Sequence, residues 1–375
     1  MDIRRLKLFN SRNAAMLTND LVQLVVEDQG GMVLEFSAKI ANGGRINPHA
    51  IPSYRGTGSS VYSDENSEFW QNNPTLYQQA GSYLVFPKED EHSTAASYWM
   101  VEQYGTDSEF GGVWLTSRMR NRLEGWQVRK LDLLLPNQPV HYTAYSFTNN
   151  APEALEATIQ SRTLLGPPFL EQGCVVNTNA EGFESFPIPN TVSRIPEGQF
   201  NDWKKVQTKE SGALDLSEIP HPTNTVDFIK AKLNQGASIG YTSLINPRMQ
   251  MAYVNFFPSK PSDEDELVFT HSSFLYQLGG MSQTPYALYD GGLDQQYMIE
   301  LGEELTTTLE SHQTKMLFHA RSFSPYDNAR LGGNFHSLEQ NQEGILLKRT
   351  KTTALIPADP TFQAVRTLAK RFFEE

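Results

Sequence analysis

The sequence predicts an all-β protein, built mostly from antiparallel strands and completed by a short C-terminal helix. Aromatic residues make up 11% of the chain, and they are frequent in strands. From Trp114 to Ile159, segments with alternating apolar and polar residues are joined by short polar turns, which is typical of antiparallel strands. No amphipathic helices alternate with these segments, which argues against βαβ units and a nucleotide-binding sheet.

The composition is that of a globular protein with a sizeable core. Hydrophobic residues make up 39% of the 375 residues and charged residues 20%. All-β domains are often long, so we expect one domain that spans residues 1–375. The formal net charge of −12 repels phosphates and anionic lipids, so neither nucleic acid nor a membrane is an expected partner.

Cysteine content and hydropathy predict a cytoplasmic protein. Cys174 is the single cysteine, so the chain forms no intrachain disulfide. The first residues lack an apolar stretch of signal-peptide length, and no segment reaches the ~18–20 apolar residues of a membrane span. Two valines follow Cys174, which favours a buried thiol over a nucleophile.

The first part of the chain is predicted to contain a hairpin and a long loop. Residues 21–40 hold two strand-like runs around a turn with Gly30 and Gly31. Residues 47–74 are rich in proline, glycine and polar residues, and we expect a loop there. Because long loops often carry binding residues, Arg55 is a candidate.

A group of aromatic residues follows this loop. Its members are Trp99, Tyr104, Phe110 and Trp114. Their rings would either stack on a ligand or pack in the core, and both alternatives remain open.

The segment Leu155–Cys174 begins as a strand and ends at a rigid turn. Apolar and polar residues alternate up to Gly166-Pro167-Pro168, where the prolines cannot donate to a sheet. The alternation places Gln160 and Arg162 on the polar face of this strand. They would either form one wall of a polar pocket or be solvated surface residues.

The run GPPFLEQG after this strand resembles the central segment of the galactose mutarotase (aldose 1-epimerase) superfamily. An Asn-rich turn at residues 148–151, the Gly-Gly hairpin and the segment Gln79–Pro87 are similar to that family too, and the resemblance extends from about Asn19 to Ser324. It implies a galactose mutarotase-like β-supersandwich whose concave sheet binds a sugar. A histidine and a glutamate of such proteins interconvert the sugar's anomers, with no metal or cofactor.

The sequence departs from the family pattern at the expected histidines. Counted back from Gly166, these positions are occupied by Ser161 and Arg162. Arginine stays protonated and cannot act as the acid, but its guanidinium can bind a carboxylate, a phosphate or two hydroxyls. The acid would then come from elsewhere, and three histidines are candidates: His271, His319 and His141.

The resemblance implies a catalytic carboxylate late in the chain. Glu300 is the first candidate and Asp290 the second. In the run 315–323, His319 and Arg321 are expected on one face of a strand, which would be either functional or a solvated sheet surface. A helix is expected over about residues 359–373, with Asp359 as its N-cap and Pro360 at its first position. Its apolar residues are expected on one face: Phe362, Val365, Leu368, Ala369 and Phe372.

The sequence therefore predicts an aldose 1-epimerase-like protein that acts on a small-molecule carbohydrate. The alternative is a non-catalytic or differently reactive protein that binds carbohydrate, including acidic or phosphorylated sugars, on the same scaffold. A lyase, a hydrolase or a purely structural role also stays open, as does the oligomeric state. The expected substrate-binding residues are Gln160, Arg162, Arg55, Trp99 and Tyr104.

Overall fold

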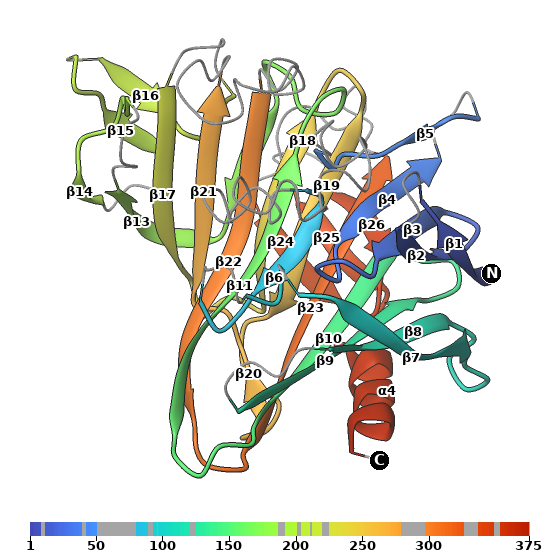
Figure 1. Ribbon diagram of the computed structural model, residues 1–375. Coiled ribbons are helices and arrows are strands. Elements are labelled where there is room, and N and C mark those ends of the chain that lie inside the picture. Colours follow the sequence, from blue (N-terminus) through green and yellow to red (C-terminus); the bar gives the residue numbers. More distant parts are fainter. Residues whose placement is uncertain are drawn as a thin grey trace, which may run out of the picture.

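Two large, mostly antiparallel sheets face one another and enclose the main core in the computed structural model of the protein (Figure 1). The structure describes residues 1–8, 12–39, 43–50, 80–88, 93–95, 97–120, 125–186, 192–200, 204–210, 212–219, 225–278, 297–325, 337–348 and 353–374. Within these residues the regular structure consists of β-strands and one helix near the C-terminus, as the sequence predicts.

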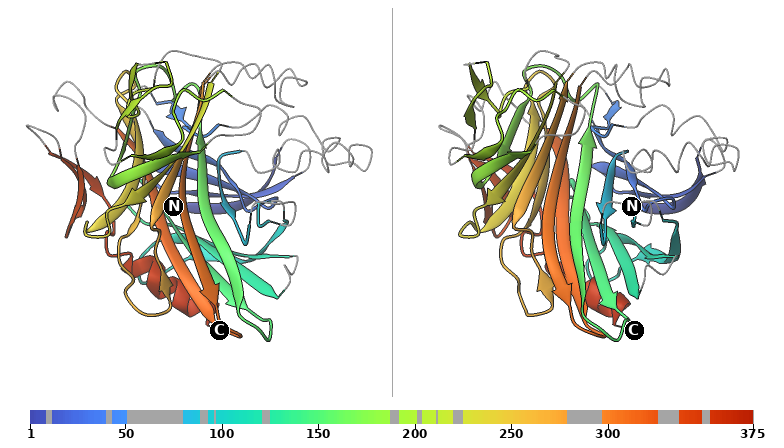
Figure 2. Two further views of the ribbon diagram at one scale, coloured as in Figure 1. Left: turned by 90° about the vertical axis from the view of Figure 1, so that its left-hand side faces the viewer. Right: turned by 60° about the vertical axis from the view of Figure 1, so that its left-hand side comes forward.

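The larger sheet has twelve strands within the described residues, and its two longest neighbouring strands lie side by side in both views of Figure 2. In hydrogen-bonded order, its strands are β1 (Asp2–Lys7), β2 (Asn13–Thr18), β3 (Val22–Glu27), β4 (Val33–Lys39), β6 (Ser82–Val85), β11 (Leu155–Leu165), β22 (Tyr297–Leu309), β21 (His271–Leu278), β17 (Thr225–Leu233), β13 (Ala180–Phe186) and β14 (Gly198–Phe200), with β5 (Arg45–Ile46) beside β4.

The second sheet has nine strands within the described residues. In order they are β12 (Val175–Thr178), β18 (Ile239–Asn246), β19 (Met251–Pro258), β23 (Thr314–Pro325), β10 (Val140–Asn149), β9 (Trp126–Leu134), β8 (Val113–Met119) and β7 (Trp99–Thr106), with β20 (Glu266–Leu267) beside β23. Smaller elements are the pair β15 (Lys205–Gln207) and β16 (Ala213–Asp215), the sheet β24 (Ser337–Asn341), β25 (Gly344–Lys348) and β26 (Thr353–Pro357), and the helix α4 (Gln363–Phe373).

The period-two alternation of the strands decides which side chains enter the space between the sheets. Leu165, Phe274 and Leu301 of the twelve-stranded sheet share one buried cluster with Leu244 and Tyr253 of the nine-stranded sheet. The predicted hairpin forms as β3 and β4, and β11 ends at Leu165, directly before the Gly-Pro-Pro turn. These local predictions are confirmed.

Helix α4 and the three-stranded sheet cover the outer face of the nine-stranded sheet (Figure 1). Val365, Leu368 and Ala369 are fully buried in one apolar cluster with residues of β9, β10 and β23. The guanidinium of Arg366 is 2.6 Å from a carboxylate oxygen of the buried Glu266, which ties the helix to β20. The predicted apolar face of the helix is therefore confirmed.

The predicted start of this helix is wrong by a few residues. The helix begins at Gln363, because Pro360 lies in a turn and Phe362 has a left-handed φ of 57°. Asp359 still caps the first turn, since its Oδ2 accepts a hydrogen bond from the backbone N–H of Ala364 at 2.9 Å.

No helix in the described part of the chain is long and apolar enough to cross a membrane.

The docking of α4 predicts a large difference between two leucine truncations. Leu368→Ala removes a fully buried side chain and should lower the free energy of unfolding by about 2–5 kcal/mol. Leu355→Ala is the matched control, because Leu355 is 42% exposed and should cost well under half as much. Urea denaturation of both variants measures this difference, and equal losses would contradict the packing described for α4.

Candidate functional site on the outer face of the twelve-stranded sheet

Four central strands bring polar residues into two adjacent rows. Backbone pairing aligns Gln160 of β11, Glu304 of β22, His271 of β21 and Lys232 of β17 in the first row. The second row contains Arg162, Gly302, Ser273 and Lys230, from the same four strands. We call these eight residues the polar rows.

The polar rows lie on the face that points away from the nine-stranded sheet. The intervening residues point inward: Thr242 of β18 donates a hydrogen bond from its hydroxyl to Glu303 Oε1 at 2.8 Å. The hydroxyl of Tyr253 of β19 is 3.4 Å from Thr163 Oγ1, which also joins the two sheets. Because successive side chains alternate, the residues on either side of Glu303 and Thr163 belong to the outer face.

The polar rows contain two internal contacts that fix long side chains. Arg162 Nε donates to Gln160 Oε1 at 2.7 Å. Lys230 Nζ donates to Glu304 Oε1 at 2.9 Å. Ser273 Oγ is buried and has no hydrogen-bond partner within the described residues.

His271 stands directly across from Glu304 in the first row. In antiparallel strands such partners have Cβ atoms about 5 Å apart, close enough for one ligand to contact both. Partial burial lowers the pKa of His271, and the nearby ammonium of Lys230 lowers it further, while Glu304 opposes this. His271 therefore releases a proton more readily than an exposed histidine does.

The structure brings three of the expected site residues together: Gln160, Arg162 and His271. Glu300 lies on β22, two residues before Gly302 of the second row. Its backbone pairs with Leu164 and Leu275. Two other candidates lie outside the described residues: Arg55 of the expected long loop and the carboxylate candidate Asp290.

Other expected site residues lie away from the polar rows. His319 and His141 are buried between the two sheets, so of the two alternatives for His319 and Arg321 the solvated sheet surface is wrong. Trp99 is 1% exposed and packs in the core, with its ring N–H bonded to the carbonyl of Thr94. Tyr104 is 49% exposed on β7, in the other sheet.

The four aromatic residues around Trp99 therefore form no common platform. Trp114 packs against Phe372 of α4, with ring centroids 4.2 Å apart. Of the two alternatives, ligand stacking or core packing, Trp99 and Trp114 therefore follow core packing.

Five residues of the polar rows were not predicted as site residues from the sequence: Glu304, Lys230, Lys232, Ser273 and Gly302. Glu304 lies four residues after Glu300 on one strand, so alternation alone would have suggested it as a second carboxylate of the same face. Nothing in the sequence pairs Glu304 with Lys230, because that contact depends on the register of β17, β21 and β22.

A buried ionic cluster lies between the sheets. Lys130 Nζ and His141 Nε2 are 2.9 and 2.8 Å from Asp132 Oδ1. Arg321 on β23 is 3% exposed, and its Nη2 is 3.4 Å from His319 Nε2. Burial lowers the pKa of His141 to about 4 despite the stabilising hydrogen bond with Asp132, so the imidazole is neutral near pH 7.

Glu303 of β22 is another ionisable residue of this interior. Burial raises its pKa to about 7, although the hydrogen bond from Thr242 and the charge of Arg321 oppose the shift. Because the folded protein holds this proton more tightly than the unfolded chain does, the stabilising contribution is complete below pH 4.5 and is lost as the pH rises through 7.

Glu303→Gln should remove this pH dependence while keeping the size of the side chain. The free energy of unfolding of the parent should fall relative to the variant, by up to about 3 kcal/mol, as the pH rises from acid to slightly alkaline. Urea denaturation of both proteins at several pH values measures the difference. A difference that stays constant with pH would show that Glu303 has an ordinary pKa.

Comparison with known proteins identifies the fold. The sequence matches no protein-family profile and no curated protein sequence. Solved structures do match: a proposed aldose 1-epimerase from Klebsiella pneumoniae aligns with a TM-score of 0.60 and 9% identity, over 88% of this chain and 84% of the other. The protein has the galactose mutarotase-like fold.

Two more solved structures support the galactose mutarotase-like fold. A galactose mutarotase-like protein from Clostridium acetobutylicum aligns with a TM-score of 0.55 and 14% identity, over 87% of this chain and 99% of the other. A proposed mutarotase from Salmonella typhimurium aligns with a TM-score of 0.53 and 8% identity, over 86% and 94%. The fold that the resemblance implied is thus confirmed, and the low identity marks a divergent chain.

Proposed function

We propose that the protein interconverts the anomers of an aldose bound on the polar rows. The observation that carries this proposal is the position of His271 directly across from Glu304, beside Arg162 and Gln160. These residues supply a proton-transfer pair and two hydrogen-bonding side chains on one sheet face. The solved structures named for aldose 1-epimerase or mutarotase activity support the same class of substrate.

The proposed chemistry needs one group that takes a proton and one that gives a proton. A carboxylate takes the proton of the anomeric hydroxyl, and His271 gives its proton to the ring oxygen as the C1–O5 bond breaks. The open aldehyde rotates about C1–C2, and closure by the reverse transfers gives either anomer. Glu304 is the proposed base, since Lys230 holds its carboxylate beside His271. Glu300 and Asp290 are the alternative bases.

Arg162 and Gln160 are proposed to orient the sugar. The guanidinium of Arg162 offers several donors in a fixed plane, which suits a pair of neighbouring hydroxyls. Hydrogen bonds of this kind hold the anomeric carbon in place between the acid and the base, so that proton transfer does not wait for reorientation.

A second candidate function is binding of an acidic or phosphorylated sugar without anomer exchange. The charge of the polar rows favours it, because Arg162, Lys230 and Lys232 oppose the single carboxylate of Glu304. Such an excess of cations attracts a carboxylate or phosphate group, and Arg162 can bind either in a bidentate manner.

Anomer exchange tests the proposed catalytic pair. In exchange NMR on the anomeric protons of glucose and galactose, the parent should accelerate exchange in proportion to its concentration. His271→Asn or Glu304→Gln should each reduce the catalysed rate by about 10²–10⁴-fold, the usual contribution of a general acid or base. His312→Asn is the matched control, because His312 is an exposed loop residue, and it should leave the rate unchanged.

The possible results separate the two candidate functions. Exchange that survives both substitutions would exclude His271 and Glu304 as the pair. Absence of exchange, with saturation transfer from the protein to an acidic sugar that Arg162→Gln abolishes, would favour the binding function. Absence of both signals would contradict a sugar site on the polar rows.

A further inference from the structure

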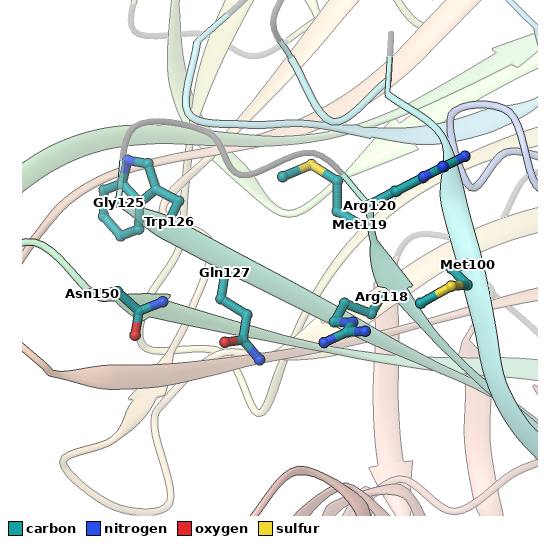
Figure 3. A pocket seen from close by; sticks show the side chains of 8 residues that line it. All are labelled: Met100, Arg118, Met119, Arg120, Gly125, Trp126, Gln127 and Asn150. Carbon is teal, nitrogen blue, oxygen red and sulfur yellow. The ribbon is translucent and has the colours of Figure 1, made fainter.

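A hollow lies at the end of the β8–β9 hairpin in the nine-stranded sheet (Figure 3). Its volume is about 730 Å³, within the range of ~300–1,000 Å³ that ligand sites usually occupy. Residues of β7, β8 and β9 line it together with the chain around Asn150, and none of the polar rows contributes. We call this hollow the hairpin groove.

The hairpin groove is positively charged on an acidic protein. Arg118 and Arg120 line it, and its described lining contains no acidic side chain. Glu102 lies nearby, but its contact with Arg118 is 3.4 Å long and it also pairs with Arg129 at 3.1 Å. With a net charge of −12 for the whole chain, two arginines on one groove form a local site for an anion.

Of the two arginines, Arg120 makes fewer polar side-chain contacts with the described part of the protein. Its side chain is exposed and makes no hydrogen bond or ion pair with any described residue. In Figure 3, Arg118 and Gln127 point the same way from neighbouring strands, whereas Arg120 extends in another direction beyond the end of β8. The two guanidinium groups therefore do not converge on a single small ion.

The neutral lining favours hydroxyl groups. Gln127 and Asn150 are exposed, and a carboxamide both donates and accepts hydrogen bonds, as a hydroxyl does. Of the large apolar lining residues, Met119 and Trp126 are at most 5% exposed, and Met100 alone is clearly accessible at 40%. Peptide ligands usually depend on buried apolar or aromatic anchors, for which this groove offers little surface.

We propose that the hairpin groove binds an acidic oligosaccharide, with Arg118 and Arg120 on carboxylates of different sugar units and Gln127 and Asn150 on hydroxyls. An arginine–carboxylate contact is strong and directional, and successive acidic units supply charges at separated positions. This proposal is independent of the proposed function, because the groove belongs to the other sheet and shares no residue with the polar rows.

Calorimetric titration of the full chain with a galacturonic acid trimer tests the proposal. The trimer should bind, and the neutral galactose trimer should bind at least tenfold more weakly. Arg120→Gln and Arg118→Gln should each weaken binding of the acidic trimer about tenfold. Affinity should also fall as added salt shortens the Debye length from about 30 Å to about 10 Å.

Control variants distinguish binding in the hairpin groove from binding elsewhere on the protein. Arg248→Gln changes the net charge by the same amount at an exposed ion pair with Glu171, and it should leave the affinity unchanged. Arg162→Gln should also leave the affinity unchanged, and the two groove variants should keep the parent's unfolding midpoint and anomer-exchange rate.

Three results would overturn the proposal. Binding that Arg162→Gln abolishes and Arg120→Gln leaves intact would assign the acidic trimer to the polar rows. Equal binding of a glutamate oligomer of the same charge would show that the groove does not select a saccharide. Absence of heat and of saturation transfer with the acidic trimer at low salt would show that the groove is not such a site.

Discussion

The cross-strand register of β11, β22, β21 and β17 is the constraint on which the site depends. Side chains alternate along each strand, so a slip of one residue would exchange the outer and inner sets. In the observed register, Gln160, Glu304 and His271 share the outer face. The same register places Ser161, Glu303 and Ser272 inside. The same strand register therefore determines which side chains form the candidate site and which lie between the sheets.

The polar interior helps to fix this register. Glu303 of β22 is 2% exposed and accepts a hydrogen bond from Thr242 of the facing sheet. Buried polar groups cost free energy unless they are paired, so an alternative register that separates these partners is strongly disfavoured. Specificity of this kind is a recognised role of buried polar contacts, although it does not guarantee greater stability.

The sequence predicted the local elements well because their signals are local. The alternation of Leu155–Leu165, its end at Gly166 and the apolar face of the terminal helix all follow from residues close in the chain. His319 was harder to place, because a polar face on a strand usually indicates solvent, whereas here it faces a buried ionic cluster. Pairing of Glu304 with Lys230 depends on residues 74 positions apart, and no pattern within either strand contains that information.

The structure shows where the two residues lie that stand in place of the family's histidines. Ser161 and Arg162, where the resemblance implies histidines, lie on opposite faces of β11, and Arg162 alone joins the polar rows. His271 enters the same rows from β21, two strands away. A proton donor supplied from a different strand can therefore serve the same sheet face.

A crystal structure of the protein with bound glucose or galactose tests the central claim most directly. We expect electron density for the sugar on the outer face of the twelve-stranded sheet, with the ring oxygen or the anomeric hydroxyl within about 3 Å of His271 and of a carboxylate. Arg162 or Gln160 should contact the remaining hydroxyls. A sugar bound elsewhere, with His271 and Glu304 free of contact, would contradict the proposed site.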